Sequence, residues 1–160
     1  MPKAHVIKNF GGPEVLEWGE VEVADPGPGE VRLRQRAVGM NMMEVGLRMG
    51  VYPGPPLPFI PGVEAAAEVI ALGEGVSDFK VGDRVGYAGT PVGSYAEERN
   101  FPESRLFSLP DDVTDVVAAA SMVKGITAEC LMRFTYEVGP QSRVLIHAAA
   151  GATGAMCVQL

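Results

Sequence analysis

The sequence has few cysteines, few basic residues and no long apolar run. Its 160 residues contain two cysteines, Cys130 and Cys157, which lie far apart and form no CxxC pair, so neither a disulfide framework nor a cysteine metal site is indicated. Thirteen lysines and arginines stand against 20 aspartates and glutamates, and the net charge of −7 would repel a nucleic-acid backbone. The apolar stretches are too short or too interrupted to cross a bilayer, and the first residues do not form a signal peptide. We therefore expect a cytoplasmic protein with reduced thiols and with no membrane or nucleic-acid partner.

The first 113 residues carry the pattern of a small antiparallel barrel. Hydrophobic residues make up 47% of the chain, which is enough to bury a core. Short segments alternate between apolar and polar residues and are separated by turns rich in glycine and proline, as expected of strands that are buried on one face. The predicted strands are residues 4–7, 31–37, 69–72 and 84–87. One short helix is predicted over residues 41–48, with Gly50 placed to end it.

From residue 114 onward the apolar residues follow helical spacing. The pattern predicts two helices with a break at Gly125. Residues 144–146 are then a continuous apolar run, which is typical of a strand that is buried on both faces of a parallel sheet.

A loop of small residues follows this predicted strand and leads into a helix. Ala149, Gly151 and Gly154 form the pattern A-x-G-x-x-G, in which the first glycine of a dinucleotide-binding turn is replaced by alanine. Glycines let the backbone approach a pyrophosphate, and the helix N-terminus offers amide groups to its oxygens. The pattern alone is a weak signal, and a tight turn without a ligand is the alternative.

Several motifs occur together in a fixed order, and their combination is more specific than any one of them. They are Gly11-Gly12-Pro13-Glu14-Val15-Leu16, Gly39-Met40-Asn41, Gly50-Val51-Tyr52-Pro53, Pro61-Gly62-Val63-Glu64, Val81-Gly82-Asp83-Arg84-Val85, Lys124-Gly125-Ile126-Thr127-Ala128 and the segment from Ser142 to Gly154. With these motifs the chain resembles the N-terminal half of the zinc-free, NADPH-dependent members of the quinone oxidoreductase/zeta-crystallin family, in the medium-chain dehydrogenase/reductase superfamily.

The resemblance implies an α/β chain with two domains. A GroES-like β-barrel catalytic domain would span residues 1–113. The start of a Rossmann domain, a doubly wound parallel sheet that binds NADP, would span residues 114–160 and would be truncated, because family members run to about twice this length.

The resemblance also implies a set of site residues. Asn41 and Tyr52 would be catalytic, with Tyr52 bordering the quinone pocket. Residues in contact with the cofactor would be Asn41, Met42, Met43, Glu44, Thr127, Cys130, Gly151, Ala152 and Thr153. Structural roles remain open for some of them: Asn41 as a helix cap, Met42 and Met43 as core residues, and Thr127 as a side chain bonded within its own helix.

The resemblance further implies an enzyme without a metal. Zinc-dependent relatives carry a cysteine at the position of Asn41 and a histidine at that of Val63, and this sequence has neither ligand. Without a Lewis acid, substrates that readily accept electrons are favoured. We therefore expect reduction of quinones, or of another electrophilic small molecule, by NADPH. The resemblance separately implies a homodimer at full length. The alternatives are an NADPH-dependent enone or 2-alkenal reductase and a non-catalytic GroES-like binding module.

Overall fold

The computed structural model describes residues 1–160, which form two compact units. The first unit spans Met1–Ala119 and the second spans Ala120–Leu160. The helix α2 (Asp115–Glu129) runs through the division between them. The domain limits expected from the sequence, at residues 113 and 114, stay a prediction for the whole protein.

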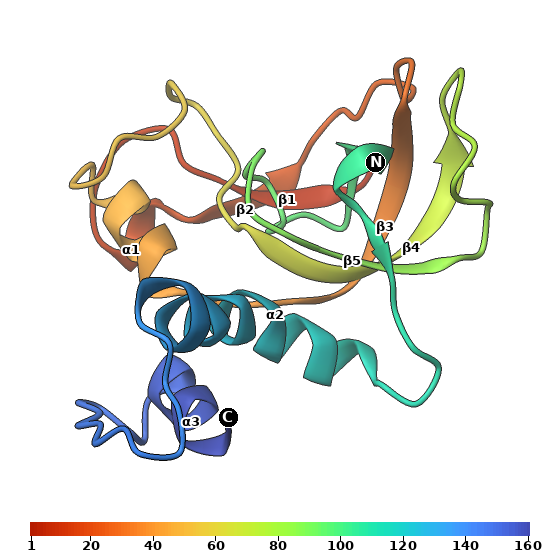
Figure 1. The fold of residues 1–160 in the computed structure, drawn as a ribbon. Coiled ribbons are helices and arrows are strands. Elements are labelled where there is room, and N and C mark those ends of the chain that lie inside the picture. Colours follow the sequence, from red (N-terminus) through yellow and green to blue (C-terminus); the bar gives the residue numbers. More distant parts are fainter. The chain divides into compact units, whose positions relative to one another are not determined.

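The first unit is built on two antiparallel sheets (Figure 1). The larger sheet has five strands in the order β6-β3-β4-β5-β7, and the smaller one pairs β1 with β2. The strands are β1 (Lys3–Val6), β2 (Glu17–Glu20), β3 (Glu30–Val38), β4 (Glu64–Leu72), β5 (Arg84–Ala88), β6 (Glu98–Pro102) and β7 (Phe107–Ser108). Two single-turn helices, η1 (Pro13–Val15) and η2 (Glu103–Arg105), lie in the connections. The predicted antiparallel strands are thus confirmed.

The alternation in β3 places the core of the first unit. Val31 and Leu33 are fully buried, while Arg32 and Arg34 on the other face pair with Glu98 of β6 at 3.6 and 3.3 Å. Burial of each such aliphatic side chain contributes about 1.5–3 kcal/mol. The same core contains a stacked aromatic pair, Tyr87 and Phe101, whose ring centroids are 4.2 Å apart. Because residues of β3 and β4 share this core, the register between the two strands is fixed. That register sets the position of the residues that follow β3.

The helix α1 (Met42–Arg48) begins just after β3, as predicted. Asn41 is its N-cap residue, and the buried Leu47 packs with Ile7 and Phe59 in a second apolar cluster. Gly50 has a φ of 71°, a left-handed conformation that glycine adopts without strain, and it ends the helical region as expected.

The second unit contains helices and loops. The predicted break at Gly125 is wrong, because α2 continues to Glu129 and is followed by a π-helical segment, η3 (Cys130–Thr135). An interior glycine costs a helix only about 1 kcal/mol, which its neighbours offset. The last element is α3 (Ala152–Gln159). No helix of the chain combines the length and the hydrophobicity that crossing a membrane requires.

The strand predicted over residues 144–146 does not form. These residues are assigned to no strand, and Val144 and Leu145 are 49% and 82% exposed. A parallel strand acquires its hydrogen bonds from a neighbouring strand, and within these 160 residues no second segment pairs with this one. The apolar run therefore lies in an extended loop before α3.

Candidate functional site

A largely buried polar cluster of the first unit surrounds Asn41. Its side-chain nitrogen Nδ2 donates to Oε1 of Glu64 at 2.9 Å and to Oε1 of Glu44 at 3.3 Å. Its backbone N–H donates to Oε2 of Glu44 at 2.8 Å, which is the carboxylate arm of a capping box. Glu44 is 4% exposed and Glu64 is fully buried, and buried carboxylates require polar partners, of which Asn41 is one.

The fold brings Asn41, Glu44 and Glu64 together through the pairing of β3 with β4. Val38 at the end of β3 lies opposite Ala65, next to Glu64 at the start of β4. Three residues after Val38, Asn41 begins α1 and places Glu44 in its first turn. Sequence reasoning singled out Asn41 and Glu44 but missed Glu64. The motif Pro61-Gly62-Val63-Glu64 was the available signal, and only Val63 was considered there.

The carboxylates of Glu44 and Glu64 also act on a nearby phenol. Burial raises the pKa of Tyr95 well above its ordinary value, and the charges of Glu44 and Glu64 raise it further. Tyr95 therefore stays neutral throughout the physiological pH range.

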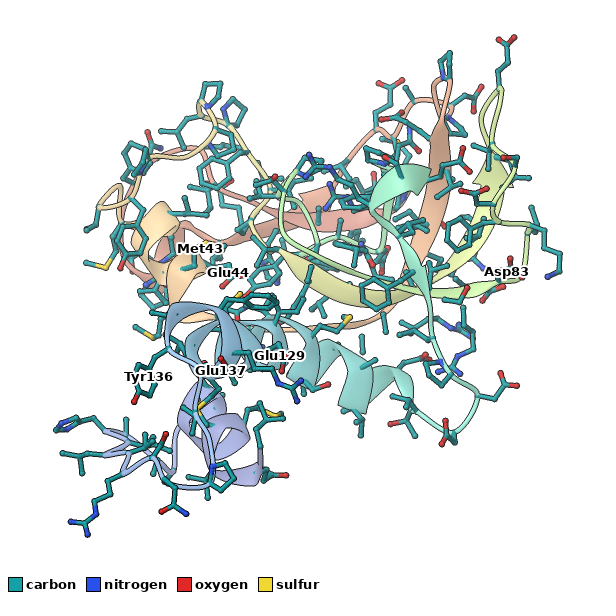
Figure 2. All side chains as sticks on the ribbon, viewed as in Figure 1. Met43, Glu44, Asp83, Glu129, Tyr136 and Glu137 are labelled. Carbon is teal, nitrogen blue, oxygen red and sulfur yellow. The ribbon has the colours of Figure 1, made fainter.

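The two methionines expected to line the site are on the surface of α1. Met42 is 78% exposed and Met43 is 40% exposed, so the core alternative is wrong for both. Figure 2 shows Met43 and Glu44 extending from α1. Met43 also borders a pocket of about 1080 Å³, together with apolar residues such as Leu47, Pro53 and Phe59.

The ring of Tyr52 packs against α1 at Gly46, where the lack of a side chain leaves room for it. A Cβ atom at Gly46 would overlap Cδ2 and Cε2 of the Tyr52 ring and would lie 2.9 Å from its Cγ. The backbone N–H groups of Val51 and Tyr52 both donate to the Gly46 carbonyl, at 2.9 and 3.2 Å. Tyr52 remains 52% exposed, which leaves its ring accessible to a ligand.

The small-residue loop of the second unit ends at an uncapped helix. Gly151 is the N-cap residue of α3, and no side chain bonds to the first amide groups of that helix. A Cβ at Gly154 would overlap the Ala148 carbonyl oxygen, so only glycine allows this close packing of loop and helix. Ala148 itself has a φ of 52°, which is unusual for a non-glycine residue.

This loop borders a pocket of about 660 Å³ in the second unit. Gly151, Ala152 and Thr153 contribute to its wall, together with Arg143 and His147. Exposed helix N-terminal amides, a close backbone approach and nearby basic side chains are the features that suit a phosphate group.

Thr127 and Cys130 do not line this pocket. The Thr127 hydroxyl donates to the Val123 carbonyl oxygen at 2.6 Å, so the bond within its own helix, which was the structural alternative, is present. Cys130 is exposed at the start of η3. Their contact with a cofactor stays a prediction.

Gly82 and Asp83 belong to the turn before β5, where Gly82 has a φ of 94°. The Asp83 carboxylate accepts from the backbone N–H and the Nζ of Lys80, at 2.9 and 2.6 Å, and closes the turn before β5. In Figure 2, Asp83 lies at the opposite end of the first unit from Glu44. No group of three or more His, Cys, Asp or Glu side chains is arranged to hold a metal ion.

Comparison with known proteins identifies the family. The chain is 48% identical over 159 residues to a quinone oxidoreductase of Pseudomonas aeruginosa, covering 99% of this chain and 49% of the relative. It is 45% identical to a 2-haloacrylate reductase of a Burkholderia species, with the same coverages. The crystal structure of the Escherichia coli quinone oxidoreductase complexed with NADPH superposes with a TM-score of 0.95 at 39% identity, over 98% of this chain and 48% of that one.

These similarities confirm the resemblance to quinone oxidoreductases, and the chain spans about half the length of the curated relatives that it matches. The alcohol dehydrogenase GroES-like domain matches residues 27–111, which is more than half of the chain. The chain therefore belongs to the alcohol dehydrogenase GroES-like domain family.

Proposed function

We propose that the full-length protein containing this chain reduces quinones with NADPH and without a metal ion. The observation that carries this proposal is the 48% identity to a quinone oxidoreductase across nearly the whole chain. The Asn41 cluster agrees with it, because an amide that is bonded to two buried carboxylates stands where zinc-dependent relatives have a cysteine ligand.

The loop before α3 fits the pyrophosphate of NADPH. The uncapped amides of Ala152 and Thr153 would donate to its oxygens, and Gly151 adds no side chain in their path. Bound NADPH would supply the electrons, either as a hydride or one at a time. The chain's own residues would bind and orient it, with Asn41, Met42, Met43 and Glu44 on the side of the nicotinamide.

The acceptor would bind beside the half-exposed ring of Tyr52. An aromatic ring offers a flat apolar face to a planar quinone. Quinones need less electrostatic stabilisation on reduction than carbonyl groups of simple aldehydes or ketones, so precise positioning of donor and acceptor would supply most of the rate enhancement.

The proposal is tested with the full-length protein. NADPH oxidation in the presence of a quinone should continue unchanged after dialysis against EDTA, and elemental analysis should find no stoichiometric zinc. Gly151→Val should raise the dissociation constant for NADPH by about tenfold or more, or about 1.4 kcal/mol, because a branched side chain would occupy the phosphate path. Loss of turnover with EDTA that zinc restores, or unchanged NADPH binding by a folded Gly151→Val protein, would contradict the respective part of the proposal.

A second candidate function is the reduction of activated alkenes. The 45% identity to a 2-haloacrylate reductase favours it, since both reactions reduce an electron-poor acceptor. Comparison of kcat/KM for a quinone and for 2-chloroacrylate separates the two functions. Faster turnover of the chloroacrylate would replace the first proposal with the second.

The full-length protein is also proposed to form a homodimer, which the mass of the protein in solution tests.

A further inference from the structure

The side-chain amide of Asn41 has no donor capacity left for a ligand. An amide nitrogen carries two N–H groups. One is directed to Glu64 Oε1 at 2.9 Å and the other to Glu44 Oε1 at 3.3 Å. Because two carboxylates take both hydrogens, Asn41 can offer a ligand only its carbonyl oxygen, Oδ1.

The orientation of this amide follows from chemistry as well as from the coordinates. A carboxylate can only accept hydrogen bonds, so the amide atom between Glu44 and Glu64 is the nitrogen. A flipped amide would set Oδ1 against carboxylate oxygens that are shielded from water, where repulsion is strong. Oδ1 has two lone pairs, and the first turn of α1 uses one at most. One acceptor position therefore remains.

Glu64 is itself held in place. The Gly39 backbone N–H donates to the Glu64 carbonyl oxygen at 3.2 Å, and a Cβ at Gly39 would overlap Glu64 Oε1. The carboxylate thus lies directly on the Gly39 backbone and is fully buried. It can neither withdraw to solvent nor rotate freely, so it imposes its position on Asn41.

We propose that Glu64 is a positioning residue that makes Asn41 a hydrogen-bond acceptor for the nicotinamide nucleoside of the cofactor. This inference rests on the proposed function and deepens it. The recognised group is a hydrogen-bond donor, either the carboxamide amino group or a hydroxyl of the adjacent ribose. A site of this kind discriminates against an analogue without the donor, because Oδ1 is then left unpaired.

The first measurement observes Asn41 without any ligand. In a ¹⁵N-labelled full-length protein, both side-chain amide protons of Asn41 should be shifted and protected from exchange. Glu64→Leu keeps a side chain of similar size but removes the acceptor, so at least one of these protons should lose its protection. Glu64→Gln retains an acceptor oxygen and should restore it. Glu68→Leu makes the same change on β4 at a residue that pairs with Arg36 instead, and it should leave Asn41 unchanged.

The second measurement is binding selectivity. Dissociation constants are determined for NADPH, for its 3-acetylpyridine analogue, which lacks the amino group, and for an analogue without the 2′-hydroxyl of the nicotinamide ribose. The wild-type protein should prefer NADPH over one of the two analogues by about tenfold or more. Glu64→Leu should abolish that preference, while Glu64→Gln and Glu68→Leu should keep it within about twofold. Melting temperatures show whether each variant is folded.

The outcomes separate this inference from the proposed function. If the wild-type protein binds NADPH but discriminates against neither analogue, or if Glu64→Leu keeps the preference, the inference is overturned while the proposed function stands. If the wild-type protein does not bind NADPH, both are overturned. If it binds NADPH with the expected selectivity but reduces no quinone, only the proposed function fails.

Discussion

The two units of the chain bury their apolar residues to very different degrees. In the first unit, strands that are distant in sequence pair with one another and fully bury residues such as Leu33, Tyr87 and Val85. In the second unit, Phe134 and Leu145 are 80% and 82% exposed, and Cys157 is one of the few buried side chains. The difference teaches that helices form from local hydrogen bonds, whereas a strand needs a partner. Within these 160 residues no strand pairs with residues 144–146, and the apolar pattern yields no strand there.

The sharpest test of this comparison makes the same substitution in both units. Leu33→Ala should lower the free energy of unfolding by about 2–5 kcal/mol, because it leaves a cavity in a closed core. Leu145→Ala should change it by less than about 0.5 kcal/mol, since Leu145 is already exposed. Urea denaturation of the 160-residue chain, followed by circular dichroism and by the fluorescence of the single tryptophan, Trp18, measures both. Equal losses would show that the second unit is as well packed as the first.

Substitutions at two glycines test whether close backbone packing determines the stability of the second unit. Gly154→Ala should destabilise the unit by about 1–3 kcal/mol, because its Cβ would overlap the Ala148 carbonyl oxygen. Gly125→Ala places its Cβ in open space inside α2 and should stabilise the helix by about 0.5–1 kcal/mol. Helical content and thermal unfolding of the two variants report the effects. A tolerated Gly154→Ala would mean that the loop and α3 do not pack as described.

The smallest expected effect is a pH dependence confined to the first unit. The side-chain hydrogen bond from Lys80, with the Lys80 backbone N–H and charge, holds the pKa of Asp83 below its ordinary value. A depressed folded-state pKa stabilises the protein above the unfolded-state value of roughly 4, and this stability is lost as the pH falls through the folded value.

Asp83→Asn provides the control for this titration. The difference in unfolding free energy between the wild-type and Asp83→Asn proteins should therefore shrink as the pH falls below about 4. A difference that grows with acidification would contradict the assignment.

Much of the first unit could be predicted from the sequence, because its signals are local. The alternation in residues 31–37 and the turn chemistry around Gly50 are confirmed by β3 and by the end of α1. Glu64 was missed because its role depends on the register of β3 with β4, which no local pattern encodes. The prediction of a strand at residues 144–146 was wrong for the same physical reason, because the pairing of strands is not local.

In the candidate site, the sequence identified those residues whose type is dictated by the local backbone. The pattern A-x-G-x-x-G singles out Gly154, and a Cβ there would overlap the Ala148 carbonyl oxygen, so this position requires glycine. The packing of the Tyr52 ring on Gly46 was not predicted, because this contact depends on how the chain turns back after α1.

The cluster of Asn41, Glu44 and Glu64 has a consequence for how such proteins diverge. A lineage that replaced Asn41 alone would leave two buried carboxylates without their shared amide, and a lineage that replaced Glu64 alone would release that amide. Each single step costs stability before any new chemistry appears, so the three positions should be inherited as one unit. Conversion of this site into a metal-binding one would thus require several coordinated changes, and ancestral reconstruction would be expected to find them on the same branch.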